Sequence, residues 1–299
     1  MAKICVLLSA YNGEQYIEEQ LQSLIAQEDV DIDILVRDDG STDMTPKILD
    51  KWQKKGKLNW YGGQNLGWAM SFMHLICHAP EADYYAFCDH DDIWLPKKLS
   101  QAVTKLEEMP EERKMYCSNM NYYRDGKDEG LVKPENLHFD IYTAMVKCIT
   151  VGCTMVFSQG LRQAIKDHPP VSVYAHDFWV YQVAMCIGNV YYDPQSFILY
   201  RQHSHNQIGQ KRTWREVWKR RWKVLKVLRH QHEREEMAQQ LLTCHTSEMT
   251  PEKRKAVERV AFYRKNIPNR LRLFFDRRYT MGRYSNNAWL RIRILIGKL

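Results

Sequence analysis

Residues 84–92 read YYAFCDHDD, a short apolar run followed by three carboxylates within four positions. Such a run is typical of a buried strand, and in open α/β sheets ligands bind beyond the strand's carboxyl end. Because neighbouring carboxylates repel one another, the cluster indicates a hard divalent ion, Mg²⁺ or Mn²⁺, whose other ligands include phosphate oxygens. The alternative is a solvated acidic turn ahead of a helix that begins near Pro96.

The residues before this stretch alternate between strand and helix patterns. Strands are predicted at 3–9, 33–37, 58–61 and 84–88, and helices at 16–25, from Thr45-Pro46 onward, and at 68–78. This alternation predicts an α/β fold with a mostly parallel central sheet flanked by helices, in which loops at the strand ends carry the chemistry.

After residue 110 the pattern is mixed. Further strands are predicted at 115–117, at 154–157 and near 190 and 197, with a polar loop at 124–136 and a helix at 176–187. The composition, 44% hydrophobic and 26% charged residues, excludes wholesale disorder.

Charge is distributed unevenly along the 299 residues. Residues 211–299 contain 24 Lys/Arg and 8 Asp/Glu, a net charge of +16, whereas residues 1–210 contain 19 and 28, a net charge of −9. The sequence therefore predicts two parts: a catalytic domain at 1–210 and a basic helical tail at 211–299. A strongly basic tail indicates a polyanionic partner, either nucleic acid or an anionic membrane.

The tail combines its basic residues with aromatic ones. Residues 211–230 contain nine Lys/Arg and one acid, with Trp214, Trp218 and Trp222 at helical spacing, and residues 270–296 repeat the theme. Interfacial helices have this composition, so we expect the tail to lie on an anionic membrane. The alternative is that the stripes pack on the catalytic domain, or on a second copy, while the basic faces are solvated.

The eight cysteines form no CxxC pair and no zinc-like spacing with histidine, which argues against a zinc site. No signal peptide and no apolar run of 18 residues is present, so we expect a cytoplasmic protein that is peripheral on the inner face of the membrane.

Four loops follow predicted strands, at Ser9–Gly13, Asp38–Asp43, Gln64–Gly67 and Asp89–Asp92. Their order and spacing resemble the inverting glycosyltransferases of family 2, whose nucleotide-sugar-binding domain has the GT-A fold. Within this family, the chain looks like the bacterial polysaccharide rhamnosyltransferase branch. Four segments carry this likeness: FCDHDDIWLPKKL (87–99), TVGCTMVF (150–157), HDFW (176–179) and YRQHSHNQIG (200–209). The resemblance covers residues 3 to about 209.

The resemblance implies a role for each loop in holding a nucleotide sugar. Tyr11 would stack on the base and Asp39 would accept its ring N–H, while Asp38 either supports that loop or reaches the same base. Many family members carry a basic residue where this chain has Gln64. The implied nucleotide-sugar-binding residues are Ala10, Tyr11, Asp38, Asp39, Asn65, Asp89 and Arg201, the last as a clamp on the departing diphosphate.

The resemblance also implies a metal site and a catalytic base. Asp91 would bind the metal, with Asp92 supporting it or ligating in its place, and His203, in preference to His205, would complete the coordination. Asp177 matches the base that deprotonates the acceptor hydroxyl, although a carboxylate at a helix N-terminus is the alternative. The acceptor-side residues would be Gly152, Cys153 and Thr154, and His176 would be structural.

The sequence therefore predicts a metal-dependent inverting glycosyltransferase that moves a sugar from a nucleoside diphosphate to a lipid-linked polysaccharide precursor. The subfamily phrases favour dTDP-rhamnose as the donor, and a UDP-hexose or UDP-N-acetylhexosamine is the alternative. Two other classes stay open. A nucleic-acid-binding protein would leave the acidic loop unexplained, and a catalytically inactive membrane scaffold would tolerate Asp91→Asn.

Overall fold

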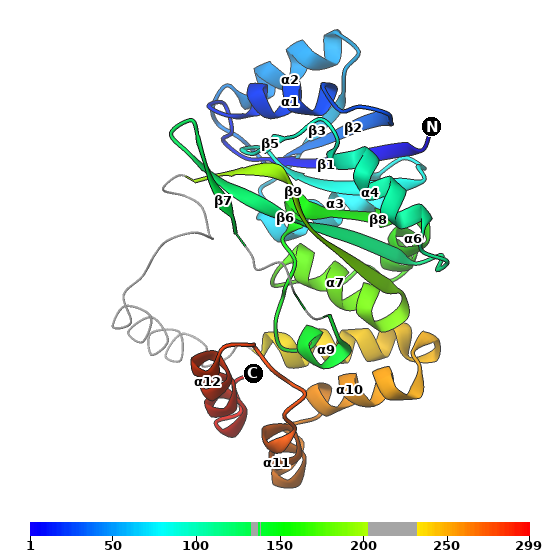
Figure 1. The fold of residues 1–299 in the computed structure, drawn as a ribbon, viewed down its shortest axis with the longest axis vertical. Helices are drawn as coiled ribbons and strands as arrows, with labels where there is room; N and C mark the ends of the chain where they lie inside the picture. Colours follow the sequence, from blue (N-terminus) through cyan, green and yellow to red (C-terminus); the bar gives the residue numbers. More distant parts are fainter. Residues whose placement is uncertain (133–136, 138, 203–231) are drawn as a thin grey trace. The chain divides into compact units, whose positions relative to one another are not determined.

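The computed structural model describes residues 1–132, 137, 139–202 and 232–299. The chain divides into two compact units (Figure 1). Unit 1 comprises Met1–His138, Thr150–Ala184 and Gly188–Ser204, and unit 2 comprises Phe139–Ile149, Met185–Ile187 and His205–Leu299. The basic segment predicted at 211–230, with its three tryptophans, lies outside the described residues.

Unit 1 is built on a nine-stranded sheet with the order β3-β2-β1-β4-β8-β6-β9-β5, to which β7 is added by pairing with β6. The strands are β1 (Lys3–Ala10), β2 (Asp31–Asp38), β3 (Asn59–Gly62), β4 (Tyr84–Asp89), β5 (Ile93–Trp94), β6 (Lys114–Arg124), β7 (Lys127–Leu131), β8 (Met155–Ser158) and β9 (Asn189–Arg201). The helices along unit 1 are α1 (Ile17–Ile25), α2 (Thr45–Lys54), α3 (Trp68–His78), α4 (Lys98–Glu107), the 3-10 turn η1 (Gly152–Thr154), α6 (Gln159–Asp167) and α7 (His176–Ile187), whose last residues belong to unit 2.

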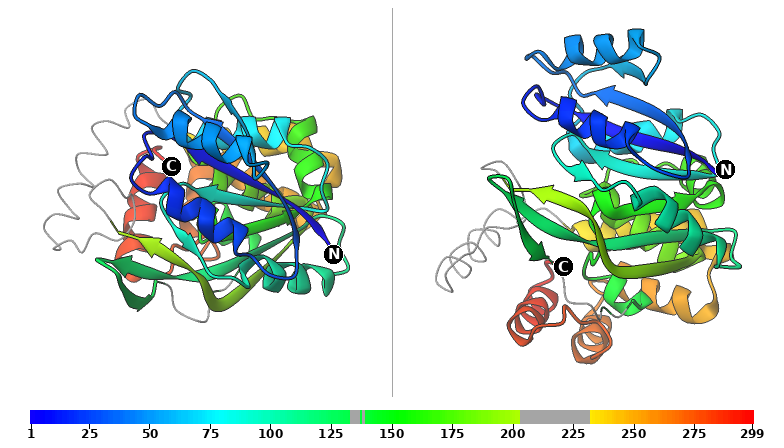
Figure 2. Two further views of the ribbon diagram at one scale, coloured as in Figure 1. Left: turned by 90° about the horizontal axis from the view of Figure 1, so that it is seen from above. Right: turned by 45° about the horizontal axis from the view of Figure 1, so that its top comes forward.

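The first half of the sheet is parallel, as the alternation of strands and helices predicts. Strands β3, β2, β1 and β4 pair in parallel, whereas β8 joins β4 in antiparallel orientation and makes the second half mixed. Alternate residues of a strand point to opposite faces. On β1, Val6 and Leu8 pack in the core formed with α1, α2 and α4, while Ser9 contacts Ser71 of α3 on the other face. Helices therefore lie on both faces of the sheet around β1 (Figure 2).

The polar loop predicted at 124–136 is wrong over its first part, because β6 and β7 form a hairpin there. Its two turn residues, Asp125 and Gly126, have φ of 49° and 77°. A two-residue type I′ turn needs positive φ at both positions, and Asp-Gly is a favoured pair for it. The strands predicted near 190 and 197 are one strand, β9, whose register against β6 shifts between Ser118 and Asn119. Pro194 lies at this shift, where its missing N–H is tolerated.

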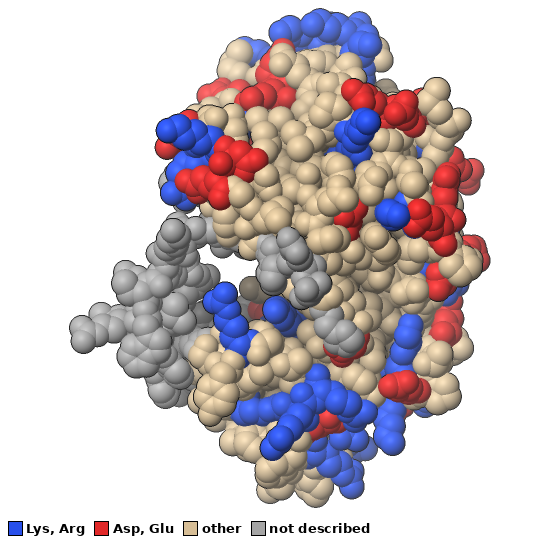
Figure 3. Space-filling model, viewed as in Figure 1, with Lys and Arg blue, Asp and Glu red and all other residues tan. Residues whose placement is uncertain are grey.

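Unit 2 is helical in the part that the structure describes. Its elements are α5 (Ile141–Ala144), α9 (Glu233–His245), the 3-10 turn η3 (Thr246–Glu248), α10 (Pro251–Ala261), α11 (Ile267–Phe275) and α12 (Tyr284–Leu295). Among the described residues, no helix combines the length and the apolar character needed to cross a bilayer. Lys and Arg side chains gather over α10 and α11 (Figure 3).

Candidate functional site

Four polar loops meet at one edge of the parallel half-sheet. The register places Ala10 beside Asp38, Ser9 beside Asp89, and Asp38 beside Gly62. Since these residues end their strands, the loops that follow lie next to one another at the carboxyl edge, where open α/β sheets bind ligands.

The loops after β1 and β2 are joined by hydrogen bonds. The backbone N–H of Asp39 donates to the Ala10 carbonyl at 2.8 Å, and Thr42 N–H donates to Asn12 Oδ1 at 2.9 Å. The Asp38 Oδ2 atom accepts the N–H of Ser41 at 3.0 Å, which supports the loop. Tyr11 is 47% exposed beside this pair, so its ring is open to a stacking partner.

Asp39 is buried and is held by an arginine that the sequence analysis did not single out. Arg37 pairs with the Asp39 carboxylate, and it also donates to Ser71 Oγ at 3.0 Å and to the Gln64 carbonyl at 2.8 Å. Both Arg37 and Asp39 are 2% exposed. The signal in the sequence was a single basic residue within an apolar strand, directly before two aspartates.

Arg37 thus ties the end of β2 to the loop that follows β3. The same Asp39 oxygen accepts the N–H of Leu66 at 2.9 Å. Gly40 has φ of +84°, and a Cβ there would lie 3.2 Å from the Gly63 carbonyl, so a side chain would crowd this approach. Asn65 is exposed at the tip of the loop, where its Oδ1 accepts the N–H of Gly67 at 3.0 Å.

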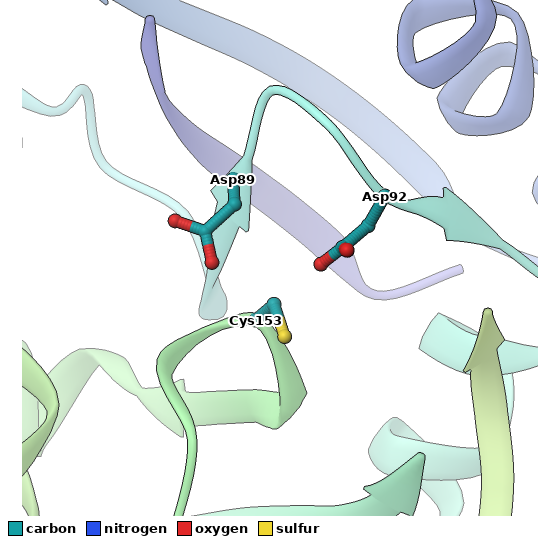
Figure 4. A group of neighbouring side chains, drawn as sticks. All are labelled: Asp89, Asp92 and Cys153. Carbon is teal, nitrogen blue, oxygen red and sulfur yellow. The ribbon is translucent and has the colours of Figure 1, made fainter. Parts of the chain in front are cut away.

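The acidic loop after β4 points carboxylates into the fold. Asp89, Asp92 and Cys153 each offer an atom within 4.8 Å of the others, and Asp92 is fully buried (Figure 4). The Arg201 backbone N–H donates to Asp92 Oδ1 at 3.2 Å, whereas Asp92 Oδ2 has no hydrogen-bond partner. Cys153, predicted on the acceptor side, therefore faces the acidic loop.

Burial is the main cause that raises the pKa of both Asp89 and Asp92, and the Asp91 charge raises both further. Carboxylates that face one another in this way favour a cation. Two or three carboxylate groups suit a hard divalent ion. The Cys153 thiol is a poor ligand here, because burial raises its pKa well above the ordinary value and keeps it protonated. The residues present thus fit Mg²⁺ or Mn²⁺ through their oxygens.

A buried lysine lies close to this loop. Lys98 is 1% exposed, its Nζ has no hydrogen-bond partner, and it lies 3.5 Å from the centroid of the Trp94 ring. Burial lowers its pKa to about 8, although the charge of Asp92 acts in the opposite direction. The pattern Trp-Leu-Pro-Lys-Lys predicts only the start of a helix and gives no sign that this amine is buried.

Asp177 lies in the first turn of α7, within reach of the acidic loop. Its charge is one of the causes that raise the pKa of Asp89, so the two carboxylates are close enough to interact. Its Oδ1 accepts the N–H of Phe178 at 2.8 Å. The structure therefore brings together Asp89, Asp91, Asp92 and Asp177, which lie up to 88 positions apart in the sequence.

His176 anchors the start of α7 in the core. Its ring stacks on Phe72 at 4.0 Å between centroids, and a Cβ at Gly152 would lie 2.5 Å from its Nε2. Only glycine lets η1 approach so closely. The Thr154 hydroxyl donates to the Val151 carbonyl at 2.8 Å, which closes the turn of η1. Burial lowers the pKa of His176 to about 3, so the imidazole is neutral.

Arg201 reaches the acidic loop from β9. Its Nε donates to the Asp91 carbonyl at 2.9 Å and its guanidinium pairs with Glu19 at 2.5 Å. Through these contacts Arg201 supports the acidic loop. The predicted contact of Arg201 with a diphosphate stays a prediction. The predicted metal ligand His203 and its alternative His205 lie outside the described residues.

The chain matches known proteins over this region. Residues 5–169 match the family model described as glycosyl transferase family 2. The chain is similar to the dTDP-rhamnosyl transferase RfbG of Shigella flexneri, with 31% identity over 232 residues, which cover 71% of this chain and 77% of that protein.

Two solved structures share the fold at 17% identity. S. aureus TarS 1–349 in complex with UDP-GlcNAc has a TM-score of 0.55 and is matched over 99% of this chain and 92% of that chain. Mannosyltransferase PcManGT from Pyrobaculum calidifontis, in complex with GDP-Man and Mn²⁺, has a TM-score of 0.53 over 99% and 88%. The predicted GT-A type of fold is confirmed. The chain is a glycosyltransferase, and it belongs to glycosyl transferase family 2.

Proposed function

We propose that this glycosyltransferase is a metal-dependent, inverting enzyme that transfers L-rhamnose from dTDP-rhamnose to a hydroxyl of a lipid-linked polysaccharide precursor. The observation that carries the proposal is the meeting of Asp89, Asp91 and Asp177 beside the loop that holds Asp39. Nucleotide, metal and acceptor functions then share one edge of the sheet. The similarity to a dTDP-rhamnosyl transferase at 31% identity supports the choice of donor.

The nucleotide is held by the loops after β1, β2 and β3. Tyr11 stacks on the pyrimidine with its exposed ring. Asp39 accepts the ring N–H, and the buried Arg37 holds that carboxylate in a fixed position. Because a preformed pocket loses little conformational entropy on binding, this arrangement favours tight and selective recognition of the base.

Asp91 would hold the divalent ion, with Asp89 and Asp92 close by. When bound, the ion would supply positive charge against the diphosphate leaving group. Asp92, with one oxygen bonded to the Arg201 backbone, orients the loop, and Arg201 supports the same loop through the Asp91 carbonyl. His203 remains a predicted additional ligand.

Asp177 accepts the proton of the acceptor hydroxyl as that oxygen attacks the anomeric carbon, on the side opposite the leaving diphosphate. A carboxylate base must lie about 2.6–3.2 Å from the hydroxyl oxygen that it deprotonates. The position of Asp177 at the start of α7, next to the acidic loop, supports this role. Attack from the opposite face inverts the anomeric configuration.

The acceptor is expected on the inner face of the cell membrane. The chain's tail carries a net charge of +16, and a basic surface is attracted to anionic lipid. A peripheral enzyme held in this way would meet a lipid-linked glycan without a spanning helix.

The test is calorimetric binding of dTDP-rhamnose, UDP-glucose, UDP-galactose and UDP-N-acetylglucosamine, each with and without Mn²⁺. We expect dTDP-rhamnose to bind in the presence of Mn²⁺ and to bind much more weakly to Asp91→Asn. If a UDP sugar binds instead, the assignment of the donor changes to that sugar, and the assignment as a metal-dependent sugar transferase is kept. If none of the four donors binds to the wild type, the dTDP-rhamnose assignment fails, and failure of a wider panel of nucleotide sugars as well would favour the inactive-scaffold alternative.

A further inference from the structure

The outer face of α11 is apolar and exposed to solvent. Ile267, Leu271 and Phe275 follow one another at intervals of four, so they lie along one face of the helix. They are 70%, 40% and 71% exposed, while Leu273 on the other face is fully buried. A helix of a globular protein normally turns its apolar stripe toward the core. Here a second stripe faces outward, which we call the α11 stripe.

Exposed apolar side chains continue beyond this stripe. The end of α12 adds Ile292, Leu295 and Ile296, which are 37%, 44% and 47% exposed. The two helices are bonded to one another, since Arg270 donates to the Leu295 carbonyl at 3.2 Å. Of the 17 exposed large hydrophobic residues in the described chain, 8 lie between residues 262 and 296. The segment that contains α11 and α12 thus holds about half of the exposed large hydrophobic residues in the part of the chain that the structure describes.

Positive charge surrounds the α11 stripe. Residues 262–299 contain ten Lys/Arg and a single acid, Asp276. That carboxylate is already engaged, because Arg278 pairs with it at 2.7 Å and Arg259 at 3.3 Å. Six of the ten cations are exposed to solvent, although one of them, Arg264, pairs with Glu235, and Arg293 is buried. The segment therefore presents more cations than carboxylates to solvent.

A hollow of about 230 Å³ lies between α10 and α11, and its α11 residues, Asn269 and Arg272, lie on a different face of the helix from the stripe. The hollow is lined by Lys255, Glu258, Arg259, Phe262, Asn269 and Arg272. Glu258 pairs with Arg254 at 2.8 Å, outside this set. Within the part of the chain that the structure describes, Lys255 and Arg272 have no carboxylate partner. The hollow thus offers cationic donors that suit a phosphate group.

Three kinds of partner differ in how well they match both the apolar stripe and the cations beside it. A nucleic acid would neutralise the cations but leave the apolar stripe in water. A second copy would cover the stripe but bring the same positive charge against it. An anionic bilayer provides both an acyl boundary and phosphates, and interfacial helices combine apolar and basic side chains in this way.

We propose that α11 lies in the headgroup region of an anionic bilayer, with Ile267, Leu271 and Phe275 toward the acyl boundary and a lipid phosphate in the hollow of Lys255 and Arg272. This inference rests on the proposed function in one respect, because that function gives the reason why the enzyme needs a membrane. Binding to lipid itself requires neither donor nor acceptor, so the two proposals fail separately.

The experiment is sedimentation of the full chain with vesicles of phosphatidylcholine, with and without about a third of phosphatidylglycerol. We expect binding only to the anionic vesicles. Leu271→Ser/Phe275→Ser should lower the partition coefficient about tenfold or more, since both side chains lose apolar burial. Lys255→Gln/Arg272→Gln should lower it by about fivefold for each cation.

Matched controls remove the same kinds of group from unit 1. Val171→Ser/Tyr174→Ser alters two exposed apolar residues, and Lys54→Gln/Lys57→Gln removes two exposed cations. Both should bind vesicles as the wild type does, and circular dichroism should show that all variants are folded. Equal binding to neutral vesicles, or stripe variants that bind like the controls, would overturn the proposal. So would stripe variants that dissociate a dimer without affecting vesicle binding, which would assign the face to a second copy.

Discussion

The buried charges of unit 1 contrast with the exposed charges around α11 in unit 2. Unit 1 buries Arg37, Asp39, Asp92 and Lys98 to 2% exposure or less, whereas most of the charged side chains of α11 and the segments around it are exposed. Buried charges cost free energy unless they are paired, while exposed charges cost little and attract partners at a distance. The difference teaches that the buried charges of unit 1 are held at fixed positions, whereas the exposed charges around α11 stay accessible to partners.

The largest effect is expected at Asp177, because the chemistry assigned to unit 1 depends on it. Asp177→Asn removes the proposed base but keeps the size of the side chain, so we expect the turnover number to fall by about 10²–10⁴-fold while donor binding is retained. Steady-state kinetics with calorimetry measures both. Asp167→Asn, on the exposed end of α6, is the control and should keep full activity. A fully active Asp177→Asn enzyme would remove this residue from the mechanism.

The second test concerns the buried pair of Arg37 and Asp39. Arg37→Met leaves the carboxylate buried without its partner, so we expect the free energy of unfolding to fall by about 3–5 kcal/mol and donor affinity to weaken. The double variant Arg37→Met/Asp39→Asn should recover part of the stability, because the uncompensated charge is gone.

The matched control is an exposed pair of the same unit. Lys51 and Glu18 lie 3.2 Å apart with side chains 57% and 37% exposed, and Lys51→Met should cost about 1 kcal/mol or less. Urea denaturation measures all of these variants. If Arg37→Met and Lys51→Met lose similar amounts of stability, burial of the Arg37 pair has no special role.

The third test uses metal and pH together. The pKa values of Asp89 and Asp92 are raised, so the folded protein holds protons that the unfolded chain releases above about pH 4. These groups therefore destabilise the fold as pH rises, unless a cation replaces the protons. We expect Mn²⁺ to raise the melting temperature more at about pH 8 than at about pH 6. An equal shift at both values, or none, would argue against a metal at this loop.

The smallest expected effect is at His176. Its folded-state pKa of about 3 lies below the ordinary value of about 6.5, so the unfolded chain takes up a proton first as pH falls. Stability should therefore fall by about 1.4 kcal/mol for each pH unit below about 6.5. His176→Gln should reduce this slope, as measured by urea denaturation over the pH range. His168→Gln changes an exposed histidine and should leave the slope as it is.

Much of the fold followed from local patterns. The helices predicted at 68–78 and 176–187 have those bounds in the structure, because apolar periodicity is a property of neighbouring residues. The hairpin of β6 and β7 was missed because the segment is polar, although Asp125-Gly126 was a usable turn signal. The division of β9 into two strands was wrong because Pro194 interrupts the pattern and the structure absorbs it in a register shift.

The loops of the candidate site were predicted from the sequence. The buried side chains that hold these loops in place were not predicted. That Asp89, Asp91 and Asp177 could share a site followed from strand order and from the resemblance to family 2. Arg37 and Lys98 were missed because burial of a cation depends on residues distant in the sequence. Arg37 is bonded to a residue 34 positions away and Lys98 lies under Trp94 in the core.

The sequence by itself determined which segments become strands and helices, which strands end in carboxylates, and that the charge changes sign near residue 210. These are properties of composition and short-range periodicity. Only the tertiary structure decided that Cys153 faces Asp92, that the Arg201 backbone holds a carboxylate 109 residues earlier, and that the α11 stripe faces solvent while Leu273 and Trp289 are buried. Burial and long-range hydrogen bonds are properties of the packed chain, because each depends on which distant residues come to lie against a side chain.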